Sequence, residues 1–434
     1  MATRAANRVA ALSAAVMMLL VVPALSAQQS VELPGRDRAI APEPEQVYSI
    51  GSMTGEEWET FGEVDRVAFD GEGNLYVLDR QNFRVVVVDP EGNLVREVGS
   101  EGDGPGELRF PMGFVVAPDG GIGVMDMGHQ AFVVYDSDGE FVGNARNDFQ
   151  SGVMGRDIHY HPRGGAIGTA SGIRMTINDG RQEISGGGSV PVRFVPFAEG
   201  GEPEQLYEAW RLPAAPRTGG ISSFSAGGGG GFTMRGMSAA RAFEPALLTG
   251  VLPDGRIVLA DSSAYALKLI GAEGGLQSVI RRPIAPRPVT RRDEEAEKAR
   301  QLENLESGAS GRPVAIMLTT GGSGGTTTQR MGGDAMSDMM RERIEGMVFA
   351  DEVPVIADLA VDWEGRIWVE RTGRRVGEDG PTDLITADGQ YLGTIAADGM
   401  RIPDAFGPGG LVAYIERDEF DLPTIVVKRL PDLP

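Results

Sequence analysis

Residues 64–99 read VDRVAFDGEGNLYVLDRQNFRVVVVDPEGNLVREVG. Four short apolar runs alternate there with tight turns rich in Gly, Asp, Asn and Pro, which is the pattern of a four-stranded antiparallel meander. Residues 112–145 repeat it as MGFVVAPDGGIGVMDMGHQAFVVYDSDGEFVGNA. Asp79 of the first segment and Asp126 of the second are 47 residues apart. The chain is therefore organised by an internal repeat of that length.

The same order of strand, glycine-containing turn and strand returns four more times, with weaker matches. These later copies occupy residues 156–170, 242–282, 355–395 and 402–430. Six four-stranded units around an axis form a β-propeller, which leaves only short sheet edges. The sequence therefore predicts an all-β, six-bladed β-propeller over residues 45–434.

The last repeat has only three strands before the chain ends. A candidate for the missing fourth strand stands at the front of the domain, where QVYSI (Gln46 to Ile50) is followed by Gly51-Ser52. The fourth strand of the first repeat is likewise followed by Gly99-Ser100. We therefore expect the N-terminal strand to complete the sixth blade and close the ring. An open solenoid or several separate sandwiches would not need this borrowed strand.

The first 27 residues have the pattern of a secretory signal peptide. Two arginines precede an apolar run over residues 9–22, and Pro23 and small residues follow it. An uncleaved anchor is the alternative, but the run is shorter than the ~20 residues that a membrane span needs. We expect cleavage near residue 27, a secreted or periplasmic mature chain with no transmembrane helix, and an extended leader over residues 28–44.

The composition excludes several classes of protein. The 434 residues include no cysteine and carry a formal net charge of −22. A thiol nucleophile, a disulfide and a thiolate metal site are therefore impossible. The acidity argues against binding to nucleic acid, because phosphate contacts need clusters of Lys and Arg. Hydrophobic residues make up 41% of the chain, which is enough for a core.

Residues 73–113 resemble the NHL repeat. The matching segments are GNLYVLD at residues 73–79, NFRV at 82–85 and GDGPGEL at 102–108. The match is strong in the first repeat, moderate in the second and faint in the others. Ala170 and Arg371, for example, stand where the motif has its aspartate. The resemblance to secreted, NHL-like six-bladed propeller proteins of bacteria implies a fold rather than a function.

Three histidines invite a metal-site hypothesis. Asp157, His159 and His161 alternate on an expected strand, so their side chains share a face and could form half of a metal site. The resemblance points the same way, since some NHL-type lyases hold a metal in the channel by histidines from several blades. The remaining histidine, His129, falls in a turn at the opposite face from His161. We therefore expect no metal and no cofactor, and interpret the alternating residues as polar members of an inner strand.

Two further strings match motifs but have simpler explanations. Residues 321–325 fit G-x-S-x-G, yet they lie in a stretch of Gly and Thr without the strand and helix that a nucleophile elbow needs. Asp136 and Asp138 resemble the start of a calcium loop, but Asn147 occupies the twelfth position, where a bidentate Glu is required. We expect a flexible loop and a hairpin turn at these places.

Residues 214–241 and 284–350 interrupt the repeat. The second insertion contains a charged segment, 291–306, expected to be a solvated helix, although it could also bind a partner. It also contains an amphipathic segment, 334–349, whose apolar face carries Met336, Met339, Met340, Ile344 and Met347. Both insertions connect the fourth strand of one blade to the first strand of the next. Such connections share one face of a propeller, so we expect both insertions there and the amphipathic helix across that face.

That loop face is the expected binding surface, with Arg80, Asn82, His129 and Gln130 contributed by nearby turns. No nucleophile, base and orienting group are assembled in the sequence, so the first hypothesis is a non-catalytic binding or interaction protein. It would act as a monomer on a protein, peptide or carbohydrate. The alternative is an enzyme that uses the central channel, either a lactonase-like hydrolase or a metal-dependent lyase, with catalytic residues that the sequence does not reveal.

Overall fold

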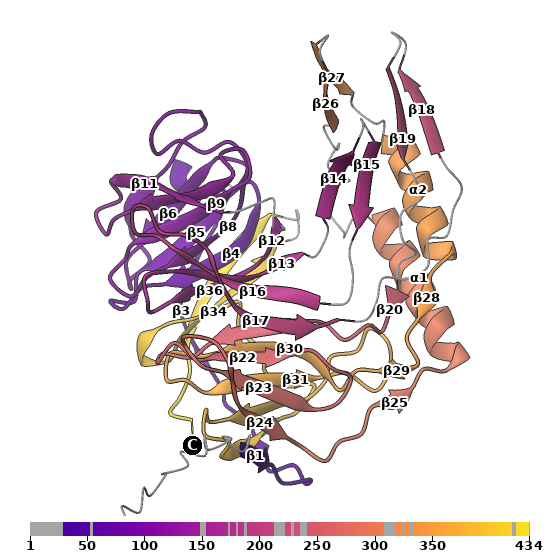
Figure 1. Ribbon diagram of the computed structural model, residues 1–434. Helices are drawn as coiled ribbons and strands as arrows, with labels where there is room; N and C mark the ends of the chain where they lie inside the picture. The colour runs from indigo at the N-terminus through magenta and orange to yellow at the C-terminus, as the bar shows by residue number, and fades with distance from the viewer. Residues whose placement is uncertain are drawn as a thin grey trace, which may run out of the picture.

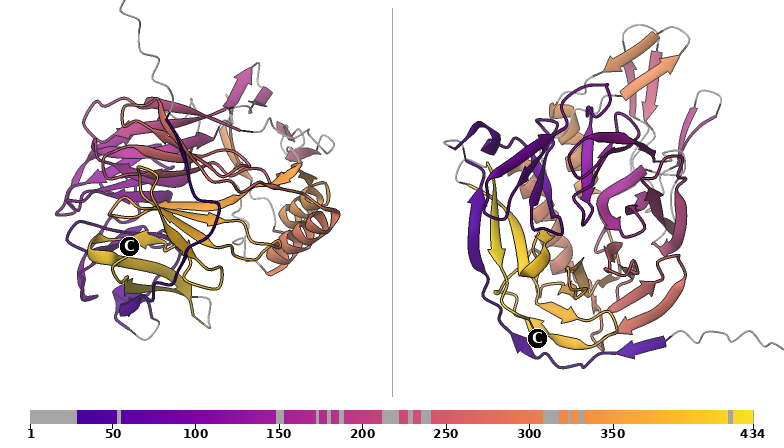
Figure 2. Two further views of the ribbon diagram at one scale, coloured as in Figure 1. Left: turned by 90° about the horizontal axis from the view of Figure 1, so that it is seen from below. Right: turned by 90° about the vertical axis from the view of Figure 1, so that its left-hand side faces the viewer.

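The computed structural model describes most of the chain after residue 28. The described residues are 29–52, 55–147, 153–171, 174–178, 181–185, 189–211, 222–226, 230–234, 241–307, 318–322, 325–329, 333–418 and 422–433. Six antiparallel sheets surround a common axis, as Figure 2 (right) shows. The chain is therefore a six-bladed β-propeller, which confirms the predicted fold class.

Blades 1 and 2 are regular meanders. Blade 1 consists of β4 (Val64–Phe69), β5 (Leu75–Asp79), β6 (Arg84–Val88) and β7 (Leu94–Val98). Blade 2 consists of β8 (Pro111–Val116), β9 (Ile122–Asp126), β10 (Ala131–Tyr135) and β11 (Phe141–Arg146). Their outer turns begin with an aspartate whose carboxylate accepts backbone N–H groups two and four residues on, as Asp136 does from Asp138 and Glu140. The calcium-like string is thus a hairpin turn.

Blades 3, 4 and 5 keep the same strand order, and blades 3 and 5 have a longer connection between their second and third strands. Blade 3 consists of β12 (Val153–His161), β13 (Gly165–Ser171), β16 (Ser189–Pro196) and β17 (Glu204–Trp210). Blade 4 consists of β21 (Leu248–Val251), β22 (Ile257–Ala260), β23 (Ala266–Ile270) and β24 (Leu276–Arg281). Blade 5 consists of β30 (Ile356–Val361), β31 (Ile367–Arg371), β32 (Thr382–Ile385) and β33 (Tyr391–Ile395). A further hairpin, β14 (Arg174–Asn178) and β15 (Arg181–Ser185), lies between β13 and β16 and was not expected.

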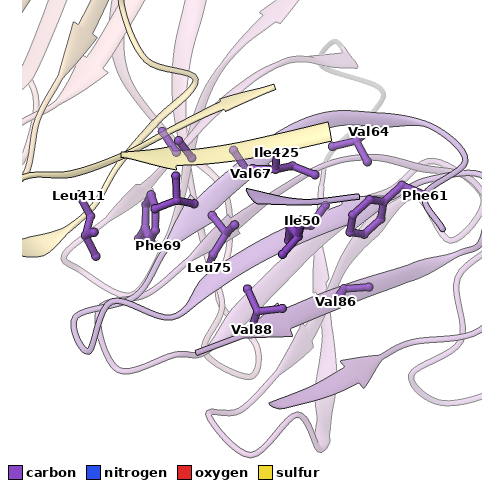
Figure 3. Packing of buried hydrophobic residues seen from close by; sticks show 14 of the residues in the cluster. Ile50, Phe61, Val64, Val67, Phe69, Leu75, Val86, Val88, Leu411 and Ile425 are labelled. Atoms are coloured by element: carbon purple, nitrogen blue, oxygen red, sulfur yellow. The ribbon is translucent and has the colours of Figure 1, made fainter. Parts of the chain in front are cut away.

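The N-terminal strand closes the ring, as predicted. Blade 6 consists of β34 (Ala405–Phe406), β35 (Leu411–Arg417), β36 (Pro423–Arg429) and β3 (Glu45–Ile50). β3 pairs antiparallel with β36, with Ile50 opposite Ile425. Both side chains are buried in a cluster that also contains Val64, Phe69 and Leu411, so one core joins blades 6 and 1 (Figure 3).

The expected leader is part of the fold. β1 (Gln29–Glu32) pairs in parallel with β24, and β2 (Ala39–Ile40) pairs in parallel with β33. They form fifth strands at the outer edges of blades 4 and 5. We call residues 29–40 the N-terminal strap. This segment was expected to precede the fold because it is rich in proline and charge. Its two strands are too short to give a recognisable strand pattern.

Buried charges fasten the strap to two blades. The Nη1 of Arg282 lies 2.7 Å from Oδ2 of Asp383, and neither side chain has any exposed surface. The Nη2 of Arg282 lies 2.7 Å from Oδ1 of Asp37 in the strap. The other oxygen of Asp37 lies 2.9 Å from Nη2 of Arg371. Blades 4 and 5 are therefore linked to the strap through a shared ionic network.

The two insertions form one unit, which we call the insertion module. The first contains β18 (Ser222–Ala226), β19 (Gly230–Met234) and β20 (Arg241–Ala242). The second contains β25 (Arg287–Pro288), α1 (Arg291–Ser307), β26 (Leu318–Gly322), β27 (Gly325–Gln329), α2 (Gly333–Glu345) and β28 (Val348–Phe349), and β29 (Glu352–Val353) follows directly after it. β20 pairs in parallel with β28, so the insertions meet on one side of the propeller (Figure 1), as the topology predicted. We call that side the insertion face.

The helices of the module pack chiefly on one another and on β20. Ile344 and Met347 are buried against Ala242, with Leu302 and Leu305 of α1 beside them. The apolar stripe thus packs within the module, which differs from the expectation that it lies directly on the blades; the side chains of Met336 and Met339 are outside the described part. Among the described residues no helix is long and apolar enough to cross a membrane. The only other helical elements described are two 3-10 turns, η1 (Glu57–Glu59) and η3 (Pro408–Gly410).

The G-x-S-x-G string does not form a nucleophile elbow. Its outer glycines belong to β26 and β27, which pair as a hairpin with Gly322 opposite Gly325. The central serine lies outside the described residues. A strand that leads into a hairpin rather than a helix cannot present a serine as that motif requires.

Candidate functional site

The first strands of all six blades surround a central channel. β4, β8, β12, β21, β30 and β34 line it, and its cavity volume is about 480 Å³. Each first strand starts where the connection from the preceding blade arrives, which is the insertion face. The N-terminal residues of these strands therefore lie at the end of the channel that the insertion module faces.

The two ends of the channel differ in polarity. Polar residues stand at or near the start of the first strands, namely Arg66, Asp157, Thr249, Asp358 and Asp404. Of these, Arg66 and Asp404 line the 480 Å³ cavity itself. At the opposite end the lining is mostly apolar and includes Phe69, Val116, Leu252, Trp363 and Phe406, beside Asp362. A ligand that enters from the insertion face meets the polar end first.

Asp157 is the centre of the polar end. Its Oδ1 lies 3.3 Å from Nη2 of Arg66 and 3.2 Å from Nε2 of His159. Its Oδ2 accepts a hydrogen bond of 3.3 Å from the hydroxyl of Thr249. Desolvation opposes the charge, but His159, Arg66 and the Thr249 hydroxyl hold the pKa of Asp157 well below its usual range. Asp157 is therefore an ionised group that joins blades 1, 3 and 4.

The pKa of Asp358 is shifted in the opposite direction to that of Asp157. Asp358 keeps exposed surface, but partial desolvation and the negative charges of Asp157 and Asp404 raise its pKa, although the Leu359 N–H donates to it at 2.8 Å. Glu370, its cross-strand neighbour, has a pKa raised by desolvation and by Asp358 and Asp379. Asp404 is held by Nη2 of Arg401 at 2.8 Å. This region thus combines the firmly ionised Asp157 with two carboxylates, Asp358 and Glu370, whose raised pKa values make them protonate more readily.

The arrangement does not reproduce a nucleophilic triad. In a triad the imidazole contacts the nucleophilic hydroxyl and the carboxylate orients the imidazole. Here the carboxylate of Asp157 stands between Thr249 and His159. Within the described residues no three His, Cys, Asp or Glu side chains are grouped so that they could hold a metal ion.

Arg80 and Asn82, two of the predicted contact residues, are engaged in the fold. Arg80 is buried, its Nε donates to the Pro111 carbonyl at 3.0 Å, and its Nη1 pairs with Glu63 at 3.0 Å and also with Asp65. The amide nitrogen of Asn82 donates to Asp79 at 2.7 Å. These side chains fix the turn of blade 1 and connect it to blade 2.

His129 and Gln130, the other two, lie in the equivalent turn of blade 2. The Nδ1 of His129 lies 3.2 Å from Oδ1 of Asp126, and the other Asp126 oxygen accepts the N–H groups of Arg109 and Phe110. Gln130 is exposed and has a positive φ of 54°. Gln130 and part of His129 thus face solvent.

His161 has a structural role. It has no exposed surface, and its Nε2 lies 2.8 Å from the carbonyl oxygen of Gly255 in blade 4. Burial lowers its pKa, which favours the neutral ring that this contact accommodates. The structure therefore brings His159 to Asp157 and uses His161 to join two blades.

Sequence reasoning missed Arg66, Thr249, Asp358 and Asp404. They belong to four different repeats, so no local motif contains them. A signal existed nevertheless, because each is a polar residue within the first three positions of a first strand or directly before it. Aligning the six repeats by strand order would have brought these positions together.

One comparison with known proteins, that with family models, describes the same fold. A family model described as a six-bladed β-propeller matches residues 53–180. No curated protein matches the sequence. Three similar structures are a protein described as exported from Bacteroides fragilis, a gluconolactonase from Xanthomonas campestris and virginiamycin B lyase from Staphylococcus aureus. Their identities to this chain are 10%, 12% and 9%, and their TM-scores are 0.46, 0.37 and 0.37. The alignments cover 93%, 91% and 85% of this chain and 99%, 100% and 80% of the respective structures.

Proposed function

We propose that this chain is an exported, non-catalytic binding protein whose ligand enters the central channel from the insertion face. The observation that carries the proposal is that polar side chains of three blades, Arg66, Asp157 and Thr249, meet near the insertion-face ends of the first strands that surround the 480 Å³ channel. Ligand pockets are commonly concave, largely apolar cavities of this size with a few convergent polar groups. The N-terminal signal pattern supports export.

The insertion module covers this approach. Figure 2 (right) shows α1 and α2 behind the ring of blades. The side chain of Arg300 on α1 reaches Gly377, in the loop between β31 and β32 of blade 5. Loops this long are usually functional or disordered. We assign the module as the lid of the binding site.

The predicted contact residues divide into two roles under this proposal. Arg80 and Asn82 act as positioning residues, because their polar groups are occupied by Asp65 and Asp79. Gln130 and the outer edge of His129 are contacts at the rim of the insertion face. The protein acts as a monomer on a peptide, protein or carbohydrate, and uses neither metal nor cofactor.

Tryptophan fluorescence tests the channel site, because Trp363 lines its apolar end. The probes are small sugars, amino acids and dipeptides. We expect one class of probe to change the fluorescence in a saturable way. The change should be lost in Asp358→Asn and in Trp363→Phe, which removes the reporter. It should be kept in Asp254→Asn, which alters an exposed turn. A saturable response that survives both Asp358→Asn and Arg66→Met would contradict binding at the polar end.

A channel enzyme is the second candidate, and the opposed pKa shifts of Asp157 and Asp358 favour it. Neighbouring acids with diverging pKa values are typical of acid–base pairs. A lactonase-like hydrolase would then use Asp358 as the proton donor; a metal-dependent lyase would need an added cation. Hydrolysis of δ-gluconolactone above the uncatalysed rate, abolished in Asp358→Asn, would replace the binding proposal with this one.

A further inference from the structure

A second concave site lies between blades 2 and 3, away from the channel. Its cavity volume is about 990 Å³, twice that of the channel. One wall comes from blade 2, at the start of β10 and the end of β11. The other comes from blade 3, at β16, β17 and the turn between them. We call it the blade 2–3 groove.

Asn147 gives this groove an unused donor. It stands directly after β11, only 5% of its surface is exposed, and it lines the groove. Its Nδ2 has no hydrogen-bond acceptor within the described part of the chain. Buried polar groups in native proteins are nearly always bonded to protein, water or a ligand. The groove therefore presents a buried donor that an acceptor oxygen of a ligand would satisfy.

The walls offer further polar groups from both blades. The opposite wall carries Arg193, which is paired across the sheet with Gln205. The other lining residues are small or polar, namely His129, Gln130, Ala131, Asn144, Ala145, Arg146, Ala198, Gly200, Gly201, Glu202 and Pro203. The lining thus includes two arginines, Arg146 and Arg193, and one carboxylate, Glu202, in a chain whose net charge is −22.

These groups select a class of ligand. Apart from the imidazole of His129, no aromatic ring or branched aliphatic side chain is among the described lining residues, so an apolar ligand would gain little. Amide side chains donate and accept hydrogen bonds and therefore suit hydroxyl groups. Guanidinium groups suit a carboxylate. A ligand that combines hydroxyls with a carboxylate meets both requirements.

We propose that the blade 2–3 groove binds a short acidic saccharide, such as a uronic acid dimer. The ligand carboxylate pairs with Arg146, and ring or hydroxyl oxygens accept from Nδ2 of Asn147 and from Gln205. Only a short saccharide is compatible with the overall charge, because a long polyanion would be repelled by the rest of the surface. His129 and Gln130, assigned above as rim contacts, also line the groove, so the variants that test this inference are placed at Asn147 and Gln205, which the proposed function does not use.

Calorimetric titration of the mature chain with digalacturonate tests the proposal. We expect saturable binding, and at least tenfold weaker binding of the neutral counterpart galactobiose. Asn147→Asp replaces the donor with a negative charge and lowers the affinity at least tenfold. Gln205→Ala, at an exposed position that folding does not require, lowers it about fivefold. Asn304→Asp, which adds the same charge on α1, leaves the affinity unchanged.

The outcomes separate the alternatives. Absence of digalacturonate binding, equal affinity for galactobiose, or full affinity in both Asn147→Asp and Gln205→Ala would overturn the proposal. Tighter binding of a glutamate dipeptide than of digalacturonate would replace the saccharide with an acidic peptide. Asp358→Asn in the channel should leave digalacturonate binding intact, so a failed channel proposal would not be mistaken for a failed groove.

Discussion

Blades 1 and 2 and blades 4 to 6 are built by different means. Each of the first two blades takes all four strands from one contiguous segment. Asp79 and Asp126 then perform the same task, since each accepts two backbone N–H groups from the segment before its own first strand. These carboxylates explain the repeated aspartate of the sequence.

Blades 4 to 6 instead receive an outer strand from residues 29–50. In blade 5, Arg371 stands at the end of the second strand, where blade 1 has Asp79. Arg371 pairs with Asp37 of the strap, and Asp383 pairs with Arg282. A distant segment therefore supplies a carboxylate that pairs with the arginine in place of the aspartate. The contacts of this pairing are between side chains, unlike the backbone N–H contacts of Asp79 and Asp126.

The largest effect is expected from deleting residues 45–52. This removes β3, exposes the edge of β36 and takes Ile50 out of the core shared by blades 6 and 1. We expect a loss comparable with the whole free energy of unfolding, about 5–15 kcal/mol for a domain. Size-exclusion chromatography should show aggregates. Deleting residues 29–40 is the matched comparison, since blades 4 and 5 keep four strands. A monomeric 45–52 deletion with unchanged melting would contradict closure.

The second-largest effect is expected from breaking the buried ion pair between Arg282 and Asp383. Arg282→Met leaves the carboxylate of Asp383 buried without its principal partner. Removing one member of a buried pair costs about 3–5 kcal/mol. Arg281→Met is the control, because the adjacent Arg281 is exposed and bonds only to Ser30 among the partners described; it should change stability by about 0.5 kcal/mol or less. Chemical denaturation measures the free energy of unfolding of both variants. Equal values for Arg282→Met and Arg281→Met would refute the role of the network.

The repeated aspartates should act alike in the regular blades. Asp79→Asn and Asp126→Asn each weaken two buried backbone hydrogen bonds, at a cost of about 1–3 kcal/mol. Asp89→Asn, in an exposed turn of the same blade, should cost less than either. Denaturation midpoints that differ widely between the first two variants would show that the turns are not equivalent.

The fold could be predicted from the sequence because its determinants are local. Apolar alternation, the turn aspartates and the 47-residue spacing lie within each repeat, and the closing strand was identified by the Gly-Ser that follows it. The strap was missed because β2 has only two residues and its pairing partners are about 350 residues away. Short parallel pairs of this kind leave no periodic pattern.

The site could be predicted only in part. Asp157 and His159 were recognised as sharing a face of one strand, and the structure brings them together. Their partners Arg66 and Thr249 come from other blades and meet them only when the ring closes. His129 drew attention for its rarity, yet its ring contacts Asp126 of its own turn. Convergence at a symmetry axis is invisible to any search for local motifs.

The smallest effect concerns Asp37, the strap residue that pairs with Arg371 of blade 5. Although desolvation opposes it, hydrogen bonds and charge from Arg371 and Arg282 lower its pKa. A lowered pKa in the folded state means that the unfolded chain binds protons more readily, so the contribution of Asp37 is present at neutral pH and is lost as the pH falls through the lowered pKa. Asp37 is half-exposed, so salt should weaken its effect. The melting temperatures of wild type and Asp37→Asn should therefore differ at pH 7 and converge toward pH 3. The same measurement on Asp89→Asn gives the comparison for a carboxylate in a blade without a strap. A gap between wild type and Asp37→Asn that widens on acidification would show that Asp37 does not act through its charge.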